Sequence, residues 1–174
     1  MYRLVFAVFL AFPNLAAADP AVCIALRDSL PDAIGSLDAT EKHDFEAEQP
    51  GLGYSAGFVS DSRFLTAYFS DFGKPSFDEH FLAELLKTSI VGIEVRLKSV
   101  PASFELLKAF QFEREDLLFR YFAIGKDSLG NGQFIAIGVL GDCIVKLRYT
   151  DSALPEQSTD TFLAMTAAVD DALQ

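Results

Sequence analysis

Two histidines, His43 and His80, are the side chains best suited to acid–base or metal chemistry in this sequence of 174 residues. His43 stands in a polar run next to Lys42 and Asp44, which indicates a solvated loop. His80 precedes Glu84 by four residues, a spacing that places both on one face of a helix. This pair supplies two metal ligands, whereas zinc sites need three or four. The sequence therefore predicts no metal site and no cofactor.

Nucleophilic catalysis has little support in the sequence. Ser55 falls within a strand pattern rather than at the strained strand-to-helix turn on which a nucleophile elbow depends. The glycine-rich run 51–57 is followed by a strand, where a nucleotide-binding loop requires a helix. Adjacent acids such as Glu115 and Asp116 do not make the separated acid and base of a glycosidase. We assign no catalytic residue and expect a non-catalytic protein; a hydrolase built from residues that folding brings together is the alternative.

Basic residues on predicted strands are the polar feature that most favours binding. Lys146 and Arg148 alternate with apolar residues, so they share one strand face, and Arg120 on another strand is expected to join them. The chain has 14 basic and 25 acidic residues and a net charge of −11, so this row is a candidate site for an anion or an acidic partner. Pairing with the protein's own acids is the alternative. The acidic balance argues against nucleic acid, which needs clustered basic residues.

The first 18 residues have the pattern of a cleavable signal peptide. Arg3 precedes the apolar stretch 4–12, and the alanines 16–18 provide the small residues that signal peptidase needs. That stretch is shorter than the roughly 20 residues of a spanning helix, and no other stretch reaches this length. We expect cleavage after Ala18, a single domain over 19–174, no membrane span, and a periplasmic or secreted location. Loss of Arg3 makes the net charge one unit more negative.

The expected location bears on the state of the two cysteines. Cys23 and Cys143 form a single pair in an oxidising compartment, which favours a disulfide between them. Two buried free thiols are the alternative. The absence of a Cys-x-x-Cys motif makes redox catalysis the weakest interpretation.

Periodicity along the chain predicts the elements that position these residues. Residues 19–50 are acidic and largely irregular, with a short helix over 21–30 and room for one edge strand near Phe45. A hairpin follows over 52–70, and a helix over 77–91 is capped by Ser76 and Glu79. Four further strands span 104–114, 117–125, 133–140 and 143–150, and a helix over 159–173 closes the chain. The order is typical of the α+β class: an antiparallel sheet of about six strands with helices on its faces.

Three stretches carry a family resemblance: residues 50–54, 64–68 and 144–150. With the order of the elements, they resemble the fold shared by PsbP, the extrinsic photosystem II protein, and the Ran-binding protein Mog. The resemblance implies an α/β/α sandwich and an accessory domain that binds a protein or another envelope component. It carries no functional residue over to this chain. Transport of a small apolar ligand in an aromatic pocket between sheet and helix is a further alternative.

Overall fold

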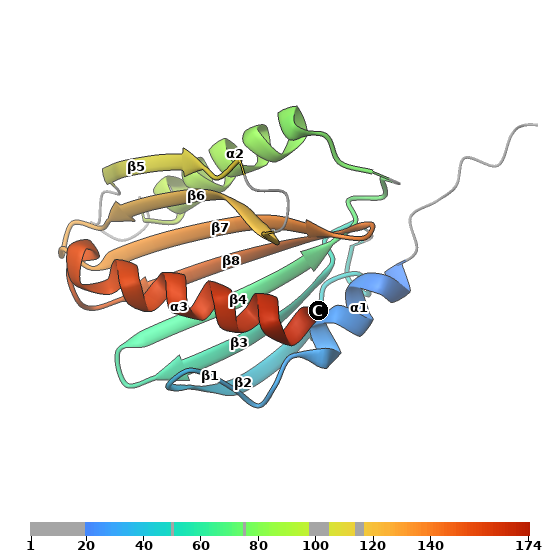
Figure 1. The fold of residues 1–174 in the computed structure, drawn as a ribbon, viewed down its shortest axis with the longest axis horizontal. Coiled ribbons are helices and arrows are strands. Elements are labelled where there is room, and N and C mark those ends of the chain that lie inside the picture. The colour runs from blue at the N-terminus through green and yellow to red at the C-terminus, as the bar shows by residue number, and fades with distance from the viewer. Residues whose placement is uncertain (1–19, 50, 75, 98–104, 114–116) are drawn as a thin grey trace, which may run out of the picture.

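A computed structural model describes residues 20–49, 51–74, 76–97, 105–113 and 117–174 of the chain. These residues form one antiparallel sheet of eight strands and three helices (Figure 1). The expected signal peptide over residues 1–18 lies outside the described residues. The α+β class is confirmed.

The sheet has the strand order β1-β2-β3-β4-β8-β7-β6-β5, so the hairpin β3–β4 pairs with the last strand. Its strands are β1 (Ala33–Ile34), β2 (Leu37–Asp44), β3 (Tyr54–Ser60), β4 (Arg63–Ser70), β5 (Glu105–Gln111), β6 (Phe119–Lys126), β7 (Gly132–Leu140) and β8 (Cys143–Asp151). The expected count of about six strands was therefore too low. The two extra strands, β1 and β2, come from the segment for which the sequence predicted mostly irregular structure. β2 is exposed from Asp38 onward, so it lacks the alternation that marks a half-buried strand.

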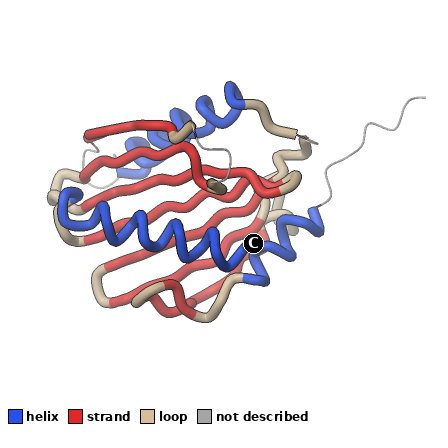
Figure 2. The backbone as a smooth tube through the Cα atoms, in the orientation of Figure 1, coloured by secondary structure: helices blue, strands red, loops and turns tan. Residues whose placement is uncertain are grey.

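The three helices are α1 (Pro20–Ser29), α2 (Glu79–Leu97) and α3 (Pro155–Leu173). α1 and α3 lie on one face of the sheet and α2 lies on the other (Figures 1 and 2). Asp78, not Ser76, caps α2: its Oδ1 accepts a hydrogen bond of 2.7 Å from the backbone N–H of Phe81. α3 begins at Pro155, four residues before the predicted start, because proline suits the first turn, where its missing N–H is not needed.

A hydrophobic core lies on each side of the sheet. Under α1 and α3, the ring of Phe162 lies 5.0 Å from that of Phe134 and 5.8 Å from that of Tyr149. On the other side, α2 buries Leu82 and Leu86 against β6 and β7. Helices thus pack on both faces, as predicted, but α2 covers only part of its face. The uncovered part holds the candidate functional site.

A disulfide ties the N-terminal helix to the last strand. Cys23 of α1 and Cys143 at the start of β8 are joined by an S–S bond of 2.01 Å, with their Cα atoms 5.4 Å apart. The predicted pairing is confirmed.

None of the helices in the described part of the chain has the length and apolar character needed to cross a membrane.

Candidate functional site

An open face lies on the α2 side of the sheet, over β2, β3, β4 and β8. α2 packs on β6 and β7 and reaches Ile144 at the start of β8. Among the described residues, no helix packs extensively on β2, β3 or β4 on this side. Strand pairing sets the open face out in three cross-strand rows. The first row is His43, Ser55, Tyr68 and Lys146; the second is Gly57, Thr66 and Arg148; the third is Val59, Phe64 and Thr150. Phe64, near the hairpin end of β4, keeps 54% of its surface exposed.

A shallow hollow of about 400 Å³ opens in this face and is lined by residues of β2, β3 and β4, among them His43, Ser55 and Phe64. Gly57 is one of the residues that line it. A Cβ atom at Gly57 would come within 2.7 Å of the Thr40 hydroxyl, so the depth of the hollow depends on the missing side chain. The open face therefore offers both apolar contact area and hydrogen-bonding groups.

Lys146 and Arg148 are the cations of the open face on β8, as their alternation in the sequence predicts. Both are half-buried. Lys146 pairs with Tyr68 across the strands and holds its Nζ 4.8 Å from the centre of the Tyr68 ring, within the range of a cation–π interaction. Arg148 lies between Thr66 and Ile135 of the adjacent strands. The two residues predicted to share a face thus lie together, between the flank of α2 and the open strands β3 and β4.

The structure does not bring Arg120 to this pair. Arg120 lies on β6, two strands away from β8, and its Nη1 is 3.9 Å from a carboxylate oxygen of Glu79 at the start of α2. A register shift between Phe119 and Tyr121 disturbs the simple alternation of β6 at this point. The described geometry therefore gives a two-residue patch, with Arg120 placed in a separate contact between helix and strand.

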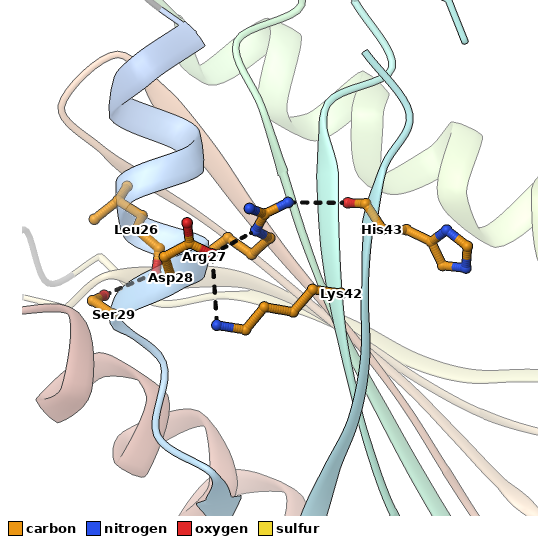
Figure 3. A network of polar contacts seen from close by, with 6 residues as sticks. All are labelled: Leu26, Arg27, Asp28, Ser29, Lys42 and His43. Carbon is orange, nitrogen blue, oxygen red and sulfur yellow. Dashed lines mark hydrogen bonds and ion pairs between the residues drawn. The ribbon is translucent and has the colours of Figure 1, made fainter. Parts of the chain in front are cut away.

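The N-terminal helix fixes the edge of the open face. Arg27 of α1 donates a hydrogen bond of 3.4 Å to the carbonyl oxygen of His43, and both Arg27 and Lys42 pair with the Asp28 carboxylate (Figure 3). The hydrogen bond from Arg27 lowers the pKa of Asp28. Figure 3 shows the His43 ring on the opposite side of β2 from α1. The network thus holds the backbone of β2 and leaves the imidazole on the open face.

Folding also places a histidine beside a serine. Ser55 lies opposite His43 in the β2–β3 ladder, and His43 Nε2 is 3.5 Å from a carboxylate oxygen of Glu41. Gly53 and Gly57 flank Ser55 in a Gly-x-Ser-x-Gly spacing, a signal that the strand context led us to overlook. However, the side chains of His43 and Glu41 are 52% and 74% exposed, and no hydrogen bond joins the side chains of Ser55 and His43 among the described residues. This solvated arrangement lacks the orientation of a working triad.

Among the described residues, no hydrogen bond or ion pair joins the side chains of His80 and Glu84, which lie one turn apart on α2. Glu84 instead holds Lys87 through a hydrogen bond of 2.6 Å, which lowers the pKa of Glu84. Within the described ranges, no group of three or more histidine, cysteine, aspartate or glutamate side chains is placed to hold a metal ion.

The element order, the two-sided helical packing and the eight-stranded antiparallel sheet define a PsbP-like α+β fold. The solution structure of cyanobacterial PsbP (CyanoP) from Synechocystis sp. PCC 6803 superposes with a TM-score of 0.52 over 80% of this chain and 92% of that chain. The sequence identity is 10%, so the similarity establishes the fold alone. No protein-family model and no curated protein matches the sequence.

Proposed function

We propose that this chain is an exported accessory domain without catalytic activity, which binds an acidic segment of a partner protein in the cell envelope through its open face. The observation that carries the proposal is the position of Lys146 and Arg148 on one face of β8, between the flank of α2 and the open strands β3 and β4. The protein has a net charge of −11, so its surface repels acidic partners elsewhere. Electrostatic complementarity of this kind selects partners and orients them.

The half-buried setting of the two cations strengthens this proposal. A charge flanked by packed side chains interacts with an incoming carboxylate through a lower effective dielectric than a fully exposed charge does. The planar guanidinium of Arg148 also suits paired hydrogen bonds to a carboxylate. The PsbP-like fold is consistent with an accessory role. The disulfide is consistent with an oxidising compartment, and N-terminal sequencing of the periplasmic protein should begin at Asp19.

Binding of a fluorescent polyglutamate peptide, followed by anisotropy at low salt, tests the proposal. We expect the double variant K146M/R148Q to bind at least about tenfold more weakly than the wild type. The double variant K87M/K108Q removes the same charge from exposed positions outside the open face and should bind like the wild type. Equal weakening by both pairs would show a response to net charge alone and would contradict the proposal.

Hydrolysis is a second candidate, because Ser55 faces His43 and lies in a hollow. A fluorophosphonate probe labels activated serines and therefore separates the two functions. The accessory proposal predicts no labelling of Ser55. Labelling of the wild type that disappears in both S55A and H43A would favour the hydrolase instead.

A further inference from the structure

A small pocket lies where the flank of α2 meets the open face. It has a volume of about 180 Å³ and is lined by the apolar side chains of Leu52, Phe72, Leu85 and Ile144, together with Tyr68 and Lys146. Leu85 comes from α2, whereas Tyr68 and Lys146 belong to the first row of the open face. The pocket therefore lies between sheet and helix, at one end of that row.

The walls of the pocket are held by hydrogen bonds. The Glu46 carboxylate accepts bonds from the backbone N–H groups of Gly51 and Gly53, the shortest being 2.7 Å. The Ser70 hydroxyl donates to the Gly51 carbonyl and accepts from the N–H of Phe72, at 3.1 Å each. These bonds fix the loop that carries Leu52 against the turn that carries Phe72. A pre-formed pocket of this kind loses little conformational entropy when it is filled.

Phe72 has a backbone conformation that points to a function. Its φ is +48°, the only positive φ among the described non-glycine residues, and L-residues rarely adopt this region. Its ring packs edge-on against Phe81 of α2, with the centres 5.6 Å apart. The unusual backbone thus places an aromatic ring at the rim of the pocket. Strained residues of this kind concentrate at ligand sites.

The chemistry of the lining defines the occupant. The walls are mainly apolar, and Lys146 is the only cationic side chain among the described residues that line the pocket. The volume is below the roughly 300 Å³ at which sites for drug-sized ligands begin, so one ring or one branched aliphatic group fills it. We infer that the pocket binds an apolar carboxylate, with the apolar group between Leu52, Phe72 and Leu85 and the carboxylate at the Lys146 ammonium. This inference goes beyond the proposed function, because the ligand need not belong to a protein.

Chemical-shift titration of the ¹⁵N-labelled full domain tests this inference with three probes: phenylacetate, its neutral analogue 2-phenylethanol, and acetate. We expect phenylacetate to shift the amide signals around Leu52, Phe72 and Leu85 at concentrations where the other two probes have little effect. K146M keeps the apolar stem but removes the charge, and should weaken phenylacetate binding about tenfold or more without changing 2-phenylethanol binding. K87M, on the exposed side of α2, should leave both unchanged.

A second pair of variants serves as a control for misfolding. L52S changes an exposed loop residue of the pocket, and L129S makes the same change in the exposed turn between β6 and β7. Only L52S should weaken phenylacetate binding. Equal binding of phenylacetate and 2-phenylethanol, shifts confined to other regions, or insensitivity to K146M would each overturn the inference.

A further experiment distinguishes a carboxylate at the chain end of a partner protein from a carboxylate on a free small molecule. A short peptide with a free C-terminal phenylalanine carries the same chemistry as phenylacetate, and its C-terminal amide lacks the charge. Binding of the peptide acid at the same signals assigns the pocket to the chain end of a partner. Binding of phenylacetate alone assigns it to a free small acid. If the pocket binds neither acid but the binding of polyglutamate still depends on Arg148, the inference is wrong and the proposed function stands.

Discussion

Asp151 is a buried carboxylate that joins the end of β8 to the segment leading into α3. It accepts hydrogen bonds from the Tyr149 hydroxyl at 2.7 Å and from the Ala153 N–H at 2.9 Å, and Arg63 Nε lies 3.4 Å away. Burial disfavours the charged form, but these contacts outweigh it and lower the pKa of Asp151. Burial, assisted by Asp151, raises the pKa of Tyr149.

The lowered pKa of Asp151 predicts a pH-dependent contribution to stability. A carboxyl whose folded pKa is depressed contributes stability above its unfolded value of about 3.9, and the contribution is lost as the pH falls through the folded pKa. At pH 7, D151N should lower the free energy of unfolding by about 1–3 kcal/mol. In urea titrations, the difference from the wild type should shrink as the pH falls below about 4, whereas D142N in an exposed turn should show little effect. A difference of constant size would contradict this role.

At the scale of elements, the entry into β3 depends on a glycine. Gly53 has a φ of +77°, and a Cβ at this position would lie 2.0 Å from the carbonyl oxygen of Phe69 on β4. Gly35, in the turn between β1 and β2, has a similar φ of +59° but open space around it. Both glycines have the left-handed backbone conformation, but only Gly53 lies close to another strand. Comparing substitutions at the two positions therefore separates the free-energy cost of the backbone conformation from the cost of a steric clash.

We therefore expect G53A to destabilise the protein far more than G35A. G35A should cost about 1–2 kcal/mol, the usual penalty for the left-handed conformation. G53A adds a backbone clash and should cost at least about 3 kcal/mol, since overpacking adds to the conformational penalty. Thermal or urea unfolding of the two variants measures the difference. Equal costs would mean that β4 moves aside without loss of stability, which would contradict this role of Gly53.

Regular elements were predictable from the sequence, and their irregularities were not. Lys146 and Arg148 were placed on one face correctly because β8 keeps its alternation throughout. Arg120 lies two strands away from this pair and contacts Glu79 of α2, because the order of the strands in the sheet, which no local pattern reveals, separates β6 from β8. β2 was missed as a full strand because its charged side chains carry no burial pattern, although pairing with β3 satisfies its backbone. Partial coverage by α2, which creates the open face, depends on packing that no local pattern reveals.

At the scale of the whole molecule, the Cys23–Cys143 disulfide joins the N-terminal helix to the last strand. The bond spans a sequence separation of 120 residues, and it holds α1, which in turn holds β2 through Arg27. The edge of the open face therefore depends on a covalent link that forms in an oxidising compartment.

Removal of this link should destabilise the protein by about 4 kcal/mol, because a loop of this length greatly restricts the unfolded chain. Urea unfolding of C23A/C143A measures the loss. Dithiothreitol should shift the wild type towards the variant and leave the variant unchanged. A variant as stable as the oxidised wild type would show that packing of α1 suffices.

The most direct measurement of the central proposal is site-specific photo-crosslinking of the protein in the cell. A benzophenone amino acid at Phe64 lies on the open face, and one at Leu129 lies in the exposed turn outside it. Binding through the open face predicts a discrete crosslink from position 64 to a protein with an acidic segment, lost in K146M/R148Q and retained in K87M/K108Q. Crosslinks of equal yield from both positions, or a crosslink from position 64 that survives K146M/R148Q, would contradict the account.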